Sequence, residues 1–285
     1  MKITLLENVG FCHGVEESLA ILEKNYQPDK ALYLLGMLVH NEIVNNELKK
    51  IGIKIINESE LQNLDKNPYD KIIFTTAHGT DPQIIQFIKK RGYQLIDTTC
   101  PIVRKNNELI NHYYQDGFEI IYIGIKNHPE STAVKKYVHI VENKNDIDNL
   151  NIINNRIVVI SQTTMTKDNI DYLYQLIINK YPNALNNTSI CPFVKKRQDE
   201  LNDFVSKNHS PLDYYLVLGG KMSNNTLKLV EIIKKYTNSV SLLSSVNEIY
   251  ELNLKDRYNV YITSGASTPM KFIREVKDFL EKNSK

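Results

Sequence analysis

The sequence predicts an α/β fold built from three similar modules. The chain has 3 cysteines, Cys12, Cys100 and Cys191, at nearly equal intervals, and each follows an apolar strand-like segment and opens a helix-like one. After each cysteine, two strand-like segments end in polar turns, again at similar intervals. Helices connect parallel strands, and ligands collect beyond the carboxyl ends of those strands. We therefore expect three α/β modules whose strand ends face one cavity.

The individual elements follow from apolar patterning and turn residues. Strands are expected at residues 2–6, 32–39, 71–76, 119–125, 156–160, 186–190, 214–218 and 259–263, and a short one within 94–103 leads to Cys100. Helices are expected at 15–24, 102–115 and 194–206, and the asparagine-rich stretch 143–155 is expected to be a loop with one poor helical turn and no function. The module boundaries are 13–100, 101–190 and 191–285, with the N-terminal strand, in 1–12, joining the central assembly.

The composition is that of a globular protein, with 42% hydrophobic residues, 24% charged residues and a net charge of +2. So small a net charge gives no long-range attraction to nucleic acid or to an anionic membrane. No segment approaches the ~20 apolar residues of a membrane span, and the apolar run within Met1–Leu6 is too short for a signal peptide. We expect a cytoplasmic protein with neither nucleic acid nor membrane as a partner.

An odd number of widely spaced cysteines argues against a disulfide framework. Each cysteine alone could be a small buried hydrophobe. At a helix N-terminus, however, the free N–H groups and the helix dipole favour the thiolate, which is the form that binds metal. Three thiolates could hold zinc with a fourth ligand, for which His13 is awkwardly placed beside Cys12, or a 4Fe-4S cluster with one iron open to substrate.

The polar turns carry hydrogen-bond donors that suit an anion. Taken singly, each serine or threonine could be a helix N-cap, but together, beside helix N-termini, such donors could bind a diphosphate without a Walker loop. Gly219 and Gly220 allow close approach of the backbone, although they lack the spacing of a phosphate-binding loop. The candidate donors are His40, His78, His128, Thr163, Ser223, Asn225 and Ser267.

Glu130 is a candidate proton donor. It lies two residues after His128, with Pro129 fixing the backbone between them, so both side chains can face one cavity. A carboxyl in a dry pocket beside an anion has a raised pKa and can donate a proton. The alternative is an exposed acid in a loop.

Together these residues resemble the 4-hydroxy-3-methylbut-2-enyl diphosphate reductase family, iron–sulfur enzymes of the methylerythritol phosphate route to isoprenoids, over essentially the whole chain. The resemblance rests on an ordered set of short motifs, each of which is weak alone. They are Gly10-Phe11-Cys12 with Gly14-Val15, Val39-His40-Asn41, Ala77-His78-Gly79, Asp97 through Thr99-Cys100-Pro101, His128-Pro129-Glu130, Gln162-Thr163-Thr164, Ile190-Cys191 with Arg197-Gln198, Ser223 with Asn225, and Gly265-Ala266-Ser267.

The resemblance implies a trefoil of three α/β modules around a central 4Fe-4S cluster on the three cysteines, with the substrate hydroxyl on the open iron. Glu130, Thr163 and His128 would then be the catalytic residues. The resemblance also implies a reductive loss of water that gives isopentenyl or dimethylallyl diphosphate, with ferredoxin or flavodoxin as the electron donor. The residues implied to bind the diphosphate substrate are His40, His78, His128, Thr163, Ser223, Asn224, Asn225 and Ser267.

Three positions depart from the family pattern. His13 stands in place of a small residue, Pro192-Phe193 in place of a small-polar pair, and Asn224 in place of a serine. None of these changes removes a cluster ligand, and the amide of Asn224 can still donate to phosphate, so the departures bear on the surroundings and potential of the cluster.

Two other classes of protein also fit the residues. One is a zinc-dependent or thiol-based phosphotransfer enzyme on a similar frame. The other is a module that binds a diphosphate or an iron–sulfur cluster without catalysis. Iron and acid-labile sulfide analysis separates the first class from a reductase, and a turnover assay with a strong reductant separates the second.

Overall fold

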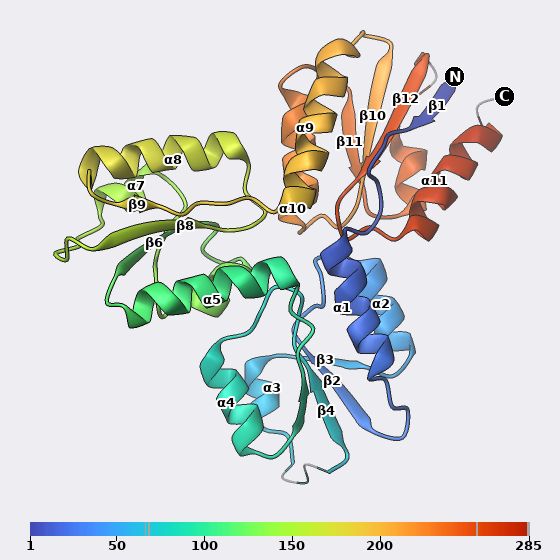
Figure 1. Ribbon diagram of the computed structural model, residues 1–285. Helices are drawn as coiled ribbons and strands as arrows, with labels where there is room; N and C mark the ends of the chain where they lie inside the picture. The colour runs from blue at the N-terminus through green and yellow to red at the C-terminus, as the bar shows by residue number, and fades with distance from the viewer. Residues whose placement is uncertain (66, 68, 255, 284–285) are drawn as a thin grey trace. The chain divides into compact units, whose positions relative to one another are not determined.

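The structure is a computed structural model that describes residues 1–65, 67, 69–254 and 256–283 (Figure 1). Its strands form three parallel sheets of four strands each, which we call the first, second and third sheet. The first sheet has the order β3-β2-β4-β5, with β2 (Ala31–Leu35), β3 (Lys54–Ile56), β4 (Lys71–Phe74) and β5 (Gln94–Ile96). The second has the order β7-β6-β8-β9, with β6 (Glu119–Ile123), β7 (His139–Val141), β8 (Ile157–Ser161) and β9 (Leu185–Asn186). The third has the order β11-β10-β12-β1, with β10 (Asp213–Leu218), β11 (Val240–Leu243), β12 (Asn259–Ser264) and β1 (Lys2–Leu5).

The three sheets share one topology. In the first two sheets, the first strand along the chain is internal, the second lies outside it, the third lies on its other side, and the fourth forms the opposite edge; in the third sheet β10, β11 and β12 take the first three places and β1 takes the fourth. The fourth strands β5, β9 and β1 are the ones that lead to the three cysteines. In the third sheet this strand comes from the N-terminus of the chain. The repeat expected from the sequence is therefore present, and the N-terminal strand completes its third copy.

Helices connect the strands, as parallel pairing requires. Several of them, including α5 and α6, begin with proline, which suits the first helical position because its missing N–H would have had no helical partner. Among the described residues, no helix is both long and apolar enough to cross a membrane. The helices are α1 (His13–Lys24), α2 (Glu42–Lys50), α3 (Glu58–Gln62), α4 (Pro82–Lys90), α5 (Pro101–Gln115), α6 (Pro129–Val134), α7 (Lys144–Asp148), α8 (Lys167–Lys180), α9 (Pro192–Lys207), α10 (Asn224–Lys234), the 3₁₀-helix η1 (Val246–Glu251) and α11 (Met270–Asn283).

The sheets are buried on both faces. In β6, Ile121 and Ile123 pack into one apolar cluster, whereas Ile120 and Tyr122 pack into another. The third sheet is built in the same way, with alternate residues of β10 in two clusters. Burial of both faces explains why these strands are continuous apolar runs and not alternating ones.

The chain packs as two compact units. The first unit comprises Met1–Glu16, Val39–Lys50 and Pro192–Lys285, and it contains the third sheet. The second unit comprises Glu17–Leu38 and Ile51–Cys191, and it contains the first and second sheets.

The α/β fold with three modules is confirmed, while some expected strand ends are wrong. The strand expected at 32–39 ends at Leu35, because Gly36 turns the chain with a φ of 92° and the next apolar residues pack from a loop. The strand expected at 186–190 is β9, which ends at Asn186, where the side chain accepts hydrogen bonds from Thr188 and bends the chain. Within 143–155, α7 is a single short helix with a complete capping box.

Candidate active site

The three cysteines are held by the same backbone contact. The backbone N–H of each cysteine donates a hydrogen bond to a carbonyl in a neighbouring turn. That turn follows the third strand of the sheet, and this third strand pairs with the strand that leads to the cysteine. The bonds run from the N–H groups of Cys12, Cys100 and Cys191 to the carbonyls of Ala266, Ala77 and Thr163, at 2.9, 3.0 and 2.9 Å.

A second contact is repeated two residues before each cysteine. There the backbone N–H donates to a hydroxyl oxygen at, or directly after, the end of the same third strand. The bonds run from Gly10, Thr98 and Ser189 to Ser264, Thr75 and Ser161, at 2.8, 2.8 and 3.0 Å. Two matched bonds per turn mean that the three cysteines occupy equivalent positions in the repeat.

Each cysteine also stands at the start of a helix. Cys100 is the N-cap residue of α5, and the carbonyl of Cys12 accepts bonds from the first turn of α1. Cys191 directly precedes Pro192, the first residue of α9. The partial positive charge of a helix N-terminus stabilises a thiolate. The turns are therefore suited to thiolate ligands, as the sequence predicts.

Glu130 is buried, with 2% of its surface exposed, and Thr163 binds both of its oxygens. The backbone N–H of Thr163 donates to Oε2 of Glu130 at 3.0 Å, and the hydroxyl of Thr163 lies 3.0 Å from Oε1. Burial raises the pKa of Glu130 to about 7, although both bonds from Thr163 act to lower it. The protonated carboxyl is thus favoured up to about neutral pH. Glu130 is thus buried as expected, and the alternative of an exposed loop acid is wrong.

His128 lies next to this acid, and His78 lies next to His128. His128 is the N-cap of α6, and its Nδ1 accepts the N–H of Glu130 at 3.2 Å. This bond requires Nδ1 to be unprotonated, which leaves Nε2 as the nitrogen that can carry a proton. The ring of His78 meets the ring of His128 edge to face, with centroids 5.4 Å apart. The second unit thus brings four predicted residues, His78, His128, Glu130 and Thr163, toward the turns of Cys100 and Cys191.

In the first unit, predicted binding residues gather in the loop that begins at Gly219 and in the first turn of α10, which follows it. Ser223 is the N-cap of α10, and its hydroxyl oxygen accepts the N–H of Thr226, so both the capping role and a donor role are open to it. Asn224 and Asn225 follow as the first residues of α10, and both are buried. Asn225 is 6% exposed, and neither its amide nitrogen nor its amide oxygen has a hydrogen-bond partner among the described residues.

His40 lies against this loop through its backbone. A Cβ atom at Gly220 would lie 2.2 Å from the carbonyl oxygen of His40, so only glycine allows the approach. Burial lowers the pKa of His40 and favours its neutral form. Ser267, buried beside Ala266, follows the turn that holds Cys12. The first unit therefore holds Cys12 and the predicted residues His40, Ser223 to Asn225, and Ser267.

Two buried polar residues near the cysteine turns had no predicted role. Arg197 lies in the resemblance motifs and Asn106 in none of them, yet both donate hydrogen bonds to residues of these turns. Each one interrupts the apolar stripe of an amphipathic helix, between Val103 and Ile110 in α5 and between Val194 and Leu201 in α9. A polar residue in such a stripe is the sequence signal that could have identified them.

The fold and these side chains define an α/β protein with a repeated cysteine turn and a buried, protonatable acid, Glu130, beside one of the three turns. The family model described as "LytB protein" matches residues 3–281. The chain therefore belongs to the LytB family.

Curated relatives and solved structures agree. The chain is 35% identical over 291 residues to a 4-hydroxy-3-methylbut-2-enyl diphosphate reductase of Bacillus cereus (strain B4264), which covers 99% of this chain and 90% of the relative. It is 34% identical to the reductase of Caldanaerobacter subterraneus, over 97% of this chain and 95% of the relative. The solved structure of the E-1-hydroxy-2-methyl-but-2-enyl-4-diphosphate reductase from Plasmodium falciparum matches with a TM-score of 0.86 and 31% identity, over 98% of this chain and 87% of that one.

Proposed function

We propose that this chain removes the hydroxyl group of 4-hydroxy-3-methylbut-2-enyl diphosphate by reduction and so forms isopentenyl and dimethylallyl diphosphate. Membership of the LytB family makes the chain an oxidoreductase of this reaction, in the synthesis of isoprenoid precursors. The roles proposed for individual residues are supported by their contacts.

Cys12, Cys100 and Cys191 are proposed to hold a 4Fe-4S cluster. The fit is supported by three matched turns, each with one thiol at a helix N-terminus, because thiolates are the ligands of such clusters. When bound, the cluster supplies electrons and an open Lewis-acidic iron. The modules are proposed to be 13–100, 101–190 and 191–285, with residues 1–12 joining the assembly, so each cysteine stands at a module boundary.

The diphosphate is proposed to bind where Asn225 is found. A buried amide with no partner is costly, so its nitrogen and oxygen call for a ligand that supplies polar atoms. Ser223 keeps its hydroxyl proton available while its oxygen caps α10, and the positive end of that helix favours an anion. The proposed binding set is His40, His78, His128, Thr163, Ser223, Asn224, Asn225 and Ser267.

The contact between Glu130 and Thr163 carries the proposed proton transfer. Because Oε2 accepts the backbone N–H, the exchangeable proton of Glu130 belongs on Oε1, where it can be donated to the hydroxyl of Thr163. The hydroxyl of Thr163 can then donate its own proton to the leaving oxygen of the substrate. Hydroxide is a poor leaving group, so a proton delivered to that oxygen lowers the barrier. His128 supports the pair by accepting the N–H of Glu130.

The electron donor is proposed to be a ferredoxin or a flavodoxin, and the location is proposed to be the cytoplasm. A reducing compartment keeps three thiols available for a cluster. An electron donor is needed because the reaction consumes two electrons for each hydroxyl group removed.

The test combines metal analysis with turnover on anaerobically prepared protein. We expect about four iron atoms and four acid-labile sulfides per chain, as the proposed cluster requires, and conversion of the substrate when a strong low-potential reductant is supplied. Zinc in place of iron would favour a phosphotransfer enzyme. A full cluster that binds the substrate without turning it over would favour a binding module.

A further inference from the structure

A buried polar side chain occupies the same place in each of the helices that follow the cysteines. It is the sixth residue after the cysteine: Ser18 in α1, Asn106 in α5 and Arg197 in α9. These residues are 1%, 7% and 7% exposed. A buried polar group needs a hydrogen-bond partner, so three at one repeated position indicate a shared task.

Asn106 reaches the turn of a cysteine that its own helix does not follow. It lies on α5, after Cys100, and its Nδ2 donates to the carbonyl of Ser161 at 3.1 Å. The hydroxyl of Ser161 accepts the N–H of Ser189 at 3.0 Å and donates to the carbonyl of Ser189 at 2.8 Å. Ser189 lies two residues before Cys191. The path therefore runs from the helix after Cys100 to the turn of Cys191.

Arg197 makes the corresponding connection, from the helix after Cys191 to the turn of Cys12. It lies on α9, after Cys191, and its two terminal nitrogens donate to the carbonyls of Ser264 and Gly10, each at 3.0 Å. Ser264 and Gly10 also bond directly to each other. One guanidinium thus joins the two segments that fix Cys12.

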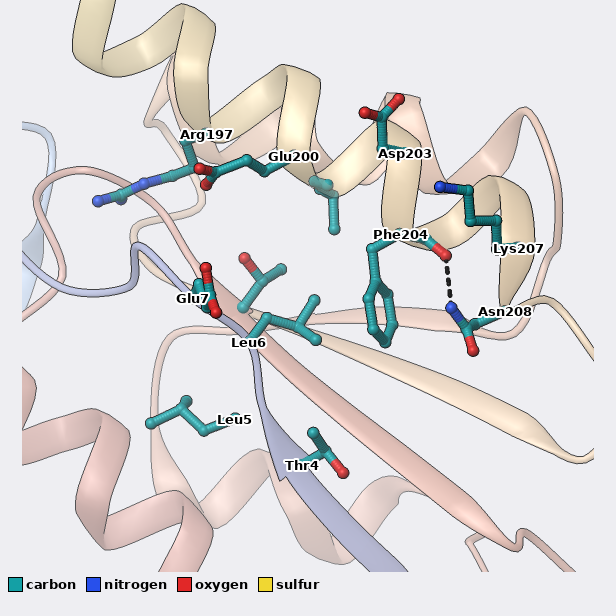
Figure 2. A pocket seen from close by; sticks show the side chains of 12 residues that line it. Thr4, Leu5, Leu6, Glu7, Arg197, Glu200, Asp203, Phe204, Lys207 and Asn208 are labelled. Carbon is teal, nitrogen blue, oxygen red and sulfur yellow. Dashed lines mark hydrogen bonds between the residues drawn. The ribbon is translucent and has the colours of Figure 1, made fainter.

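A cavity of about 500 Å³ lies beside Arg197, between α9 and the segment that begins with β1 (Figure 2). Figure 2 shows Arg197 at one end of the cavity and Phe204 and Asn208 at the other, with the side chain of Arg197 directed away from them. Both terminal nitrogens donate to carbonyls of the Cys12 turn, so the guanidinium and that turn are held together by two hydrogen bonds.

We propose that Asn106 and Arg197 are positioning residues that act across the repeat: Asn106 fixes the turn of Cys191, and Arg197 fixes the turn of Cys12. The purpose of this arrangement rests on the proposed function, because three thiols need fixed turns if they share one cluster. Each helix that follows a ligand would then hold the next ligand in place. Ser18 occupies the third such position.

The test measures the alkylation of each cysteine in the full chain prepared without a cluster, by peptide mass spectrometry after brief exposure to iodoacetamide. Arg197→Met should raise the rate at Cys12 about tenfold, because two buried carbonyls lose their donor and the turn opens more often. Cys100 and Cys191 should stay within about twofold of the original chain. Asn106→Ala should raise the rate at Cys191 and leave Cys100 and Cys12 unchanged.

Matched controls lie on the same helices. Lys196→Met changes an exposed cation beside Arg197, and Asn111→Ala removes an exposed amide from α5; neither should alter any of the three rates. Arg197→Lys keeps the charge but offers one ammonium for two carbonyls, so it should give an intermediate rate at Cys12. If Arg197→Met is not recovered folded, Arg197→Lys and Asn106→Ala still carry the test.

The decisive result is faster alkylation only at the cysteine whose turn the altered residue contacts, and not at the cysteine that precedes the altered helix. An equal rise at all three cysteines, or a rise at the cysteine that precedes the altered helix, would overturn the proposal. A parallel measurement on cluster-loaded protein should show faster loss of iron in Arg197→Met and Asn106→Ala than in their controls. Failure of the unaltered chain to take up iron would count against the proposed function, whereas the alkylation pattern would still test the positioning roles.

Discussion

The turn after β8 differs from the turns after β4 and β12 at one informative position. In all three turns, a backbone carbonyl accepts the N–H of a cysteine at about the same distance. The residue that provides the carbonyl is alanine in two turns, Ala77 and Ala266, and threonine in the other, Thr163. The backbone contact is repeated, and the hydroxyl is not. The scaffold therefore comes from the repeat, and the proposed proton path comes from a departure from it.

Two buried polar residues at matching places in their helices differ in that one has a hydrogen-bond partner and the other lacks one. Glu130 lies two residues after the N-cap of α6, and Asn225 lies two residues after the N-cap of α10. Both are buried, but Thr163 binds Glu130, while Asn225 has no partner in the described part of the chain. The turn of the third sheet has Ala266 where the second has Thr163, and alanine offers no hydroxyl. The missing hydroxyl is consistent with the unpartnered amide of Asn225, on which the proposed diphosphate site rests.

The largest effect should come from replacing a cysteine of the repeated turns. Cys100→Ser should abolish cluster retention and turnover, because the proposed site then loses one of three ligands and a serine hydroxyl is a poor substitute for a thiolate. Cys12→Ser and Cys191→Ser should behave alike if the turns are equivalent. Iron analysis and single-turnover assays on the three variants check this. Full iron occupancy with normal activity in any of them would break the equivalence.

The next largest effect should come from Glu130, in the proposed proton path. Glu130→Gln keeps the shape of the side chain but removes the transferable proton, so kcat should fall on the order of 10²–10⁴-fold. Iron content and substrate affinity should be unchanged. Single-turnover reduction and substrate binding on one sample separate the two effects. Near-normal turnover would move the proton-donor role to the diphosphate or to His128.

The sequence predicted the repeat because its signals are local. Each cysteine, with a strand before it and a helix after it, and each polar turn after an apolar run, can be recognised from neighbouring residues. The outer strands β3, β7 and β11 were not predicted, since three or four residues carry too little periodicity to distinguish a strand from a loop.

The contacts between distant segments could not be predicted. Nothing near Thr163 in the sequence indicates that its hydroxyl and N–H both reach Glu130, because the pairing of β6 with β8 brings them together. The same holds for Arg197 and Gly10, which are joined by the third sheet and α9. The family resemblance predicts which residues form the site, and the structure adds which atoms donate and accept in the contacts among them.

The pH dependence of the free energy of unfolding should also distinguish the role of Glu130 from that of Asn225. The pKa of Glu130 is raised from 4.5 to about 7 in the folded protein, so folding holds the proton through this range. The free energy of unfolding should therefore fall as pH rises from about 4.5 to about 7, by about 3 kcal/mol from this group, and level off above. Urea unfolding of cluster-free protein at pH 5 and pH 8 measures it. Glu130→Gln should lose this dependence, whereas Asn225→Ala should keep it.

The smallest effect tests the hydroxyl that distinguishes the second turn. Thr163→Ala gives this turn the residue found in the other two, keeps the N–H bond to Oε2 and removes the bond to Oε1. We expect kcat to fall about tenfold or more, from the loss of one hydrogen-bonded relay group, and Thr163→Ser to restore most of it. Because the hydroxyl stabilises the carboxylate, its removal should also raise the pKa of Glu130 further and move the pH profile upward. Iron content should not change, since the carbonyl that anchors Cys191 belongs to the backbone. Unchanged kcat and pH profile in Thr163→Ala would mean that the second turn, like the other two, only holds its cysteine.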